Sequence, residues 1–183
     1  MTRTELEHII RAVAAITNEN ELIVIGSQAI LGQYPDAPKK LLISDEADIY
    51  APARPDLSDL IDGALGELSQ FETTFGYRAD GVGPGTATLP SGWKDRLIPI
   101  VNENTNGATG WCLECHDIAV AKYVAGREKD LRYIADLWDE DLIDSQTMEQ
   151  RLKQTPMSDA VRRRVDTRMR QDRARYGRGD VHA

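Results

Sequence analysis

Apolar residues recur at every third or fourth position in two N-terminal segments, residues 4–17 and 56–69, which is typical of helices with one buried face. Thr4 and Glu7 have the spacing of a capping box and predict where the first helix begins. The helical pattern returns in the C-terminal half of the chain. Four further helices are predicted there, over residues 116–125, 127–140, 146–153 and 158–175.

Short apolar runs bounded by glycine or proline predict strands. They lie at residues 21–25, 47–50, 77–82 and 96–101. The first run ends at Gly26-Ser27, where we expect a sharp turn into a second helix over residues 27–31. Pro99 cannot donate to a strand ladder, so the last run is predicted to lie at a sheet edge. Residues 34–40, with two prolines, and the polar residues 102–110 are expected to form connections.

The order of these elements predicts the fold class and the regions of the chain. Strands and helices alternate in the first part, and only helices follow. We therefore expect an α/β (α+β) protein with a small mixed sheet flanked by helices and an all-helical C-terminal half. The predicted regions are an α/β core over residues 1–110 and a helical region over residues 111–183 that ends in an arginine-rich helix.

The composition fits a folded protein that does not enter a membrane. Of the 183 residues, 41% are hydrophobic, which is enough for a packed core. No stretch approaches the roughly 18 consecutive apolar residues that a membrane helix needs. The first residues, MTRTELEHII, contain acids and lack the apolar segment of a secretory signal. We therefore expect a cytoplasmic protein with no membrane partner.

Charge is unevenly distributed along the chain, whose formal net charge is -8. Residues 161–183 contain eight arginines and three aspartates, so this segment carries +5 and residues 1–160 carry -13. A basic tail on an acidic body is typical of contact with a polyanion, although a solvated arginine-rich helix would have the same composition. The acidic body would repel nucleic acid unless metal ions or a local basic patch offset its charge.

Two segments of the N-terminal half carry candidate chemistry. Gly26-Ser27 lies at a strand-to-helix turn, where a glycine lets the backbone approach a phosphate and a helix start offers free N–H groups. Glu46 and Asp48 are at i and i+2 of a predicted strand, so both acids point to the same face. Because Mg²⁺ or Mn²⁺ would remove their repulsion, a metal site is predicted at this pair. A solvent-facing acidic strand is the alternative.

Lys122 is the single charged residue in the apolar segment 118–125. A helix that is apolar nearly all round is buried, and burial of an unpaired ammonium group is costly. Lys122 is therefore expected to extend its ammonium group to the surface, to pair with an acid, or to bind phosphate in a polar cleft.

Cys112, Cys115 and His116 form the C-x-x-C-H string that c-type haem attachment uses and that can supply half of a zinc site. Haem attachment of this kind requires export, and the chain has no second cysteine pair to complete a zinc site. Two reduced thiols and no haem are expected.

In combination, these segments resemble the nucleotidyltransferase superfamily, whose motif is an apolar-Gly-Ser turn followed by an acid-x-acid strand. The matching pieces are Val24–Ser27 and Glu46–Tyr50, with Glu46 in place of the usual Asp and a longer spacer between them. Residues 115–138 resemble the helical segment of AbiEii-type and MenT-type toxin nucleotidyltransferases. A less characterised bacterial group placed with them is similar through the strings GSQAILG, EADIY, LPSGW and AGREKD.

The resemblance implies an enzyme that transfers a nucleotidyl group from a nucleoside triphosphate to a hydroxyl of RNA, a protein or a small molecule, with Mg²⁺ or Mn²⁺ as cofactor. It also implies a toxin role, with tRNA or other RNA and an antitoxin protein as partners. A catalytically degenerate module that binds a protein or nucleic acid is the alternative, because Glu46 departs from the superfamily pattern.

The same resemblance implies the site residues. The catalytic set is Glu46, Asp48, Lys122 and Asp130; the nucleotide-binding set is Gly26, Ser27, Arg127 and Lys129; and the metal ligands are Glu46 and Asp48. A third strand carboxylate is common in the superfamily. Asp80 or Asp95 could supply it, although we expect each of them to be a turn residue.

Overall fold

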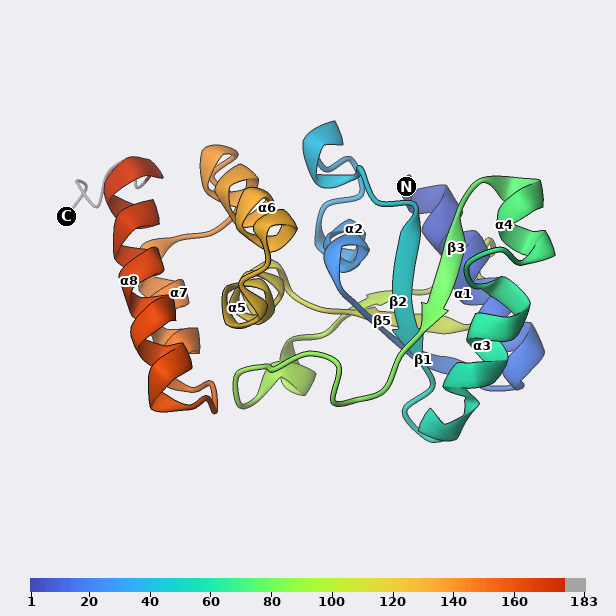
Figure 1. Cartoon of the computed structure of the whole chain (residues 1–183). Coiled ribbons are helices and arrows are strands. Elements are labelled where there is room, and N and C mark those ends of the chain that lie inside the picture. Colours follow the sequence, from blue (N-terminus) through green and yellow to red (C-terminus); the bar gives the residue numbers. More distant parts are fainter. Residues whose placement is uncertain (177–183) are drawn as a thin grey trace. The chain divides into compact units, whose positions relative to one another are not determined.

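The computed structural model describes residues 1–176 of the chain (Figure 1). These residues form two compact units. The first comprises Met1–Ala87 and Lys94–Glu114, and the second comprises Thr88–Trp93 and the described residues from Cys115 onward. Arg178 and the rest of the basic tail after Tyr176 lie outside the described residues.

The first unit is built on a five-stranded mixed sheet, which confirms the predicted fold class. Its strands are β1 (Glu21–Ile25), β2 (Glu46–Tyr50), β3 (Arg78–Gly81), β4 (Ile98–Ile100) and β5 (Thr109–Cys112), and their order across the sheet is β3-β2-β1-β5-β4. β1 is antiparallel to β2 and parallel to β5, β2 is parallel to β3, and β4 is antiparallel to β5. β4, which contains Pro99, lies at an edge as predicted.

The polar turn predicted over residues 102–110 was wrong at its end, where strand β5 begins with Thr109. The sequence of β5, Thr-Gly-Trp-Cys, has no apolar run of the kind that marked the other strands. Gly110 is instead required by packing, because a Cβ atom at this position would overlap the side chain of Ile10. This strand is therefore specified by its contacts with neighbouring elements rather than by its own pattern.

Helix α1 (Arg3–Thr17) has its cap two residues before the predicted one. Thr2, not Thr4, forms the capping box: its hydroxyl accepts from the Glu5 backbone N–H at 3.3 Å, and its own N–H donates to Glu5 Oε2 at 2.6 Å. The same Thr-x-x-Glu spacing occurs at both places. Glu7 instead accepts hydrogen bonds from Asn102 and Asn104, both at 2.8 Å, so it is committed to tertiary contacts.

The helix predicted over residues 56–69 is shorter, α3 (Ser58–Leu65), and a second helix that the sequence did not predict follows it, α4 (Gln70–Phe75). α3 ends at Gly66, and Leu68, which the helical stripe had included, is 90% exposed. The α-helix that residues 27–31 were expected to begin starts at Ile30. A 3-10 turn (Ser27–Ala29) leads into the short helix α2 (Ile30–Gln33).

Helices α1 and α3 lie side by side and cover one face of the sheet (Figure 1). That face is apolar: Val24, Ala47, Ile49 and Ala79 on the central strands are buried. Since side chains alternate along a strand, the positions between them belong to the opposite face. This opposite face carries the charged residues of β2 and β3.

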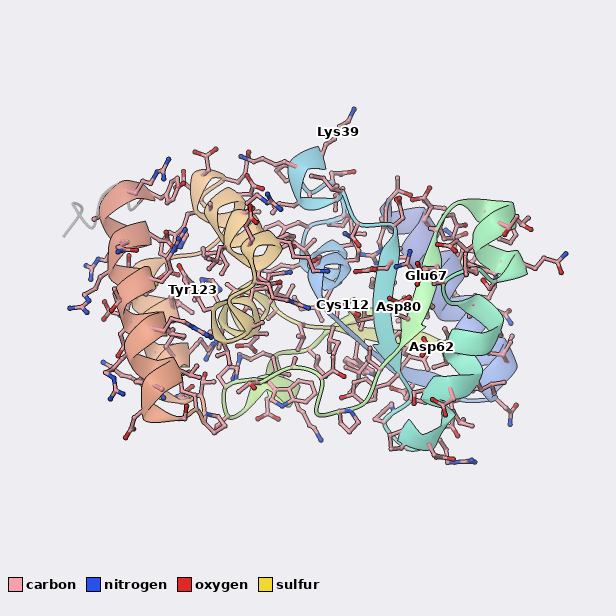
Figure 2. The ribbon with its side chains drawn as sticks, in the orientation of Figure 1. Lys39, Asp62, Glu67, Asp80, Cys112 and Tyr123 are labelled. Carbon is pink, nitrogen blue, oxygen red and sulfur yellow. The ribbon has the colours of Figure 1, made fainter. Side chains whose placement is uncertain are left out.

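The second unit contains four helices, and its described residues confirm the predicted all-helical half. They are α5 (Cys115–Ala125), α6 (Glu128–Asp139), α7 (Ser145–Lys153) and α8 (Asp159–Tyr176). α5 packs against the other three. The hydroxyl of Tyr123 on α5, labelled in Figure 2, donates to Asp172 on α8 at 2.9 Å and accepts from Trp138 on α6 at 3.0 Å. No helix among the described residues is long and apolar enough to cross a membrane.

Candidate active site

Strand β2 presents its two acids to one face of the sheet, as the sequence predicted. Ala47 and Ile49 are completely buried, whereas Glu46 and Asp48 at the alternate positions are partly exposed. This alternation confirms that the two carboxylates share a face.

Strand β3 adds a second pair of charged residues to the same face. In the parallel register, Arg78 lies opposite Glu46 and Asp80 lies opposite Asp48, while Ala79 between them is buried. Residues paired in this way have side chains on the same side of the sheet, about 4.8 Å apart across the strands. Three carboxylates and one guanidinium therefore occupy a small area of β2 and β3.

The turn after β1 contacts the Asp48 carboxylate directly. Ile25, the last residue of β1, is paired with Asp48 in the antiparallel register. Gly26 then adopts φ 74°, and a Cβ atom at this position would overlap Asp48 Oδ2. Glycine is therefore required twice here, for its backbone conformation and for the space that Asp48 occupies.

The turn continues into the 3-10 segment that Ser27 begins. Because this segment and α2 are short, the dipole expected at a longer helix start is weaker here. The side chain of Gln28 is buried, and neither of its polar atoms has a hydrogen-bond partner within residues 1–176. An unsatisfied buried amide costs stability, and such costs are common at functional positions. The sequence had not singled out Gln28.

Arg78 is the centre of the charge network. Its Nη2 donates to Glu46 Oε2 at 2.5 Å, its Nε to Asp80 Oδ1 at 2.9 Å, and its Nη1 to Glu72 Oε1 at 3.0 Å. Burial lowers the pKa of Arg78, but its hydrogen bond with Asp80 and the attraction of the other carboxylates outweigh this and raise the pKa above its ordinary value. The guanidinium is therefore a fixed positive charge among three acids.

The resemblance implied a third strand carboxylate and left two candidates for it, Asp80 and Asp95. The expectation that Asp80 would be a turn residue was wrong, because it lies in β3 directly opposite Asp48 (Figure 2). Asp95 lies in a 3-10 segment, Trp93–Arg96, and is exposed. The strand predicted over residues 77–82 already contained Asp80, and the polar-apolar alternation of Arg78-Ala79-Asp80 was the signal that Asp80 belongs to it.

The donors at this face fit a divalent cation that shares its coordination with a substrate. Mg²⁺ is usually held by one or two carboxylates together with phosphate oxygens and water. Asp48 and Asp80 supply two carboxylates at paired positions, and Glu46 supplies a third beside them. Within residues 1–176, no group of three or more His, Cys, Asp or Glu residues forms a ready cage for a metal. These carboxylates could therefore hold a cation only if further ligands from outside the protein completed its coordination.

The second unit brings three of the other predicted residues together. The Lys122 ammonium lies 3.3 Å from Asp130 Oδ1 and over the Tyr133 ring, and Arg127 Nε donates to Asp130 Oδ2 at 2.7 Å. Asp130 is completely buried and also accepts from the Arg127 backbone N–H at the start of α6. Burial raises the pKa of Asp130, but its hydrogen bond with Arg127 and the two cations outweigh this and lower the pKa.

Of the three outcomes expected for Lys122, pairing with an acid is present in the structure. Lys129, in the first turn of α6, is exposed. Contacts of Lys122, Arg127 and Lys129 with a nucleotide, and a catalytic role for Asp130, stay predictions from the resemblance.

The two cysteines are free and buried, Cys112 in β5 and Cys115 at the start of α5. Burial raises the pKa of Cys112 to about 12. Its thiol is therefore protonated and unreactive at neutral pH.

Comparison with protein families agrees with this geometry. The family described as a nucleotidyltransferase of unknown function (DUF6036) matches residues 4–176. The chain belongs to this family. Separate searches of curated proteins and of solved structures gave no match. The DUF6036 assignment confirms the predicted nucleotidyltransferase superfamily, while the AbiEii and MenT type stays a prediction.

In this DUF6036 chain, the residue that sequence reasoning missed most clearly is Arg78. Its partner Glu72 lies in α4, a helix that the sequence had not predicted. Arg78 lies two positions before Asp80, which suggested that the two side chains share a face of the strand. Which acids Arg78 contacts, however, depends on which strands are neighbours in the sheet. That information comes only from the fold.

Proposed function

We propose that this DUF6036 chain is a metal-dependent nucleotidyltransferase that moves a nucleotidyl group from a nucleoside triphosphate to a hydroxyl group. The observation that carries the proposal is the contact of the Gly26 turn with the Asp48 carboxylate. A glycine turn is a backbone corner that phosphate can approach, and a carboxylate beside it can hold the cation that phosphate transfer needs. Neither the glycine turn nor the carboxylate alone is specific for phosphate transfer, but in this chain the two are in direct contact.

The strand order β1-β2-β3 suggests which group binds the triphosphate, which holds the cation and which lies beside the acceptor. It arranges the Gly26 turn, Asp48 and Asp80 one after another across the sheet. In the proposal the triphosphate lies at Gly26 and Ser27, and Asp48 would hold Mg²⁺ or Mn²⁺ with the help of Glu46 and of one oxygen of Asp80. The acceptor hydroxyl lies beside Asp80.

The proposed reaction is an in-line displacement at the α-phosphorus. The acceptor oxygen bonds to the α-phosphorus, the bond to the oxygen that bridges the β-phosphorus breaks, and pyrophosphate leaves with the bonding electrons. Asp80 takes the proton of the acceptor hydroxyl. When bound, the cation neutralises charge that develops on the phosphate oxygens.

We propose RNA as the acceptor, because of the surface that α8 offers. Five of its arginines are exposed: Arg163, Arg164, Arg170, Arg173 and Arg175. Arginine side chains bind phosphate through paired N–H donors, and they can offset the acidic charge of the rest of the chain. The resemblance to AbiEii-type and MenT-type proteins extends this proposal to a toxin that is neutralised by an antitoxin protein.

Label transfer tests the proposal. The protein is incubated with each α-labelled nucleoside triphosphate, Mg²⁺ or Mn²⁺, and total cellular RNA and protein. Labelled RNA should form, and Asp48→Asn should reduce its formation at least about 100-fold, since an electrostatic group of the reaction is lost. Asp45→Asn is the matched control, because Asp45 is the neighbouring, 68% exposed acid and pairs with the Met1 ammonium instead. Equal activity of Asp48→Asn and Asp45→Asn would contradict the site.

A second pair of variants tests the glycine contact in the same assay. Gly26→Ala should also abolish transfer, because its methyl group would displace the Asp48 carboxylate. Gly76→Ala has the same backbone strain, with φ 78°, but open space around the position, and should retain transfer. If both variants lose activity equally, strain alone explains the effect and the Gly26–Asp48 contact is not functional.

A degenerate binding module is the second candidate function, and the Arg78 network favours it. The bonds of Arg78 to Glu46 and Asp80 engage two of the three carboxylates that a cation would need. A module of this kind would bind RNA or a protein without metal and would transfer no label. Binding that Asp48→Asn leaves unchanged would support it over the enzyme.

A further inference from the structure

Arg78 holds the position that a bound cation would otherwise hold at this face. Its guanidinium is 20% exposed and lies between three carboxylates whose side chains are 26–32% exposed. Without a positive charge between them, these acids would repel one another in a partly desolvated setting. In this network one guanidinium contacts three anionic partners, and a divalent ion could contact some of the same acids.

We propose that Arg78 is the resident counter-ion of the site and that a divalent cation must compete with it for Glu46 and Asp80. The inference rests on the proposed function, because it concerns the cation of the same reaction. The guanidinium already takes one oxygen from each of these two acids, from Asp80 at 2.9 Å and from Glu46 at 2.5 Å. Arg78 thereby sets the affinity for the metal and acts as a positioning residue.

Glu72 would keep its ion pair with Arg78 after a cation displaces the guanidinium from Glu46 and Asp80. It belongs to α4, outside the β2–β3 pair, and its Oε1 accepts from Arg78 Nη1 at 3.0 Å. Its other oxygen, Oε2, accepts from the Leu68 backbone N–H at 2.7 Å, which fixes the carboxylate in the turn before α4. Arg78 can therefore leave Glu46 and Asp80 while it keeps one ion pair.

Calorimetric titration with Mn²⁺ alone, without nucleotide, tests the competition. Arg78→Gln should bind Mn²⁺ at least about tenfold more tightly than the natural chain, because it removes a positive charge that contacts two of the ligands. Arg54→Gln is the matched control. It removes one positive charge from an arginine of the same unit, whose partner is Asp56, and should leave Mn²⁺ affinity unchanged.

The double variant Asp48→Asn, Arg78→Gln tests whether the tighter Mn²⁺ binding occurs at this site or elsewhere on the protein. Asp48 is not one of the three carboxylates bonded to the guanidinium in the network above, but the proposed function makes it a metal ligand. The double variant should lose the tighter Mn²⁺ binding. Arg78→Lys serves as a second variant if Arg78→Gln does not fold. Its single ammonium cannot span the three acids as a guanidinium does, so its Mn²⁺ affinity should lie between those of the natural chain and Arg78→Gln.

The outcomes separate the two proposals. If the natural chain and Arg78→Gln bind Mn²⁺ equally and both need Asp48, the metal site stands and the competition is refuted. If Arg78→Gln binds more weakly than the natural chain, Arg78 supports the metal site instead of competing for it. If neither binds Mn²⁺, or if binding is independent of Asp48, both the competition and the metal-dependent function are refuted.

Discussion

Each of the two units of this protein contains a network of charged side chains, and the two networks have opposite central charges. In the first unit, one cation, Arg78, is surrounded by three carboxylates that are partly exposed. In the second unit, one carboxylate, Asp130, is completely buried and is held by two cations, Lys122 and Arg127. The first network is partly accessible to water and places three carboxylates around one guanidinium. In the second network the central carboxylate of Asp130 is not exposed, although its partner Arg127 is 65% exposed.

This difference separates a site from a structural element. A buried pair is costly to break, because the remaining charge cannot be solvated, whereas a partly exposed network can exchange its partners at small cost. We therefore infer that the Asp130 network mainly stabilises the α5–α6 junction. The Arg78 network has the properties expected of a place where ligands bind.

The largest effect is expected for Asp130→Asn. It removes the buried carboxylate that the Lys122 ammonium and the Arg127 guanidinium contact, and it should lower the free energy of unfolding by about 3–5 kcal/mol in urea denaturation. Glu128→Gln is the control, since Glu128 is 85% exposed and pairs with the exposed Arg132; its effect should be much smaller. The double variant Lys122→Met, Asp130→Asn should recover most of the loss. A small effect of Asp130→Asn would show that the two networks do not differ as described.

A smaller effect is expected for Arg78→Gln. It leaves three carboxylates close together, but each of them can reach water, so the free energy of unfolding should fall by about 1–2 kcal/mol. Mg²⁺ or Mn²⁺ should restore this loss, since a divalent ion supplies the missing charge. Neither ion should restore the stability of Asp130→Asn. Metal rescue of both variants, or of neither, would remove the distinction between the networks.

Local periodicity was sufficient for much of the fold and for part of the site. The spacing of apolar residues located the helices of the second unit, and alternation placed Glu46 and Asp48 on one face of β2. Both signals depend on residues that are close in sequence. The break at Gly66 was present in the sequence as well, but the apolar stripe around it obscured it.

Features that depend on distant neighbours could not be predicted in this way. Strand β5 has no apolar run because Gly110 makes room for Ile10 of α1. The bond of Arg78 to Glu46 spans 32 residues and requires the parallel pairing of β2 with β3. For Lys122, the sequence left three outcomes open because a partner eight residues away, across the turn at Gly126, is near only when α6 folds back on α5.

The smallest predicted effect is the pH dependence of the stability that the Asp130 network contributes. The pKa of Asp130 is lowered in the folded chain from a model-peptide value of 3.8, so the folded state favours the ionised carboxylate. Its contribution to stability is then complete above that value and is lost as pH falls through the lower, folded-state pKa. The difference in free energy of unfolding between the natural chain and Asp130→Asn should therefore be constant near neutral pH and should narrow below about pH 4. Urea denaturation at a series of pH values measures this difference. If it stays constant down to the lowest pH at which both proteins fold, the ionised carboxylate is not what the two cations stabilise, and the contrast between the units would rest on packing instead of charge.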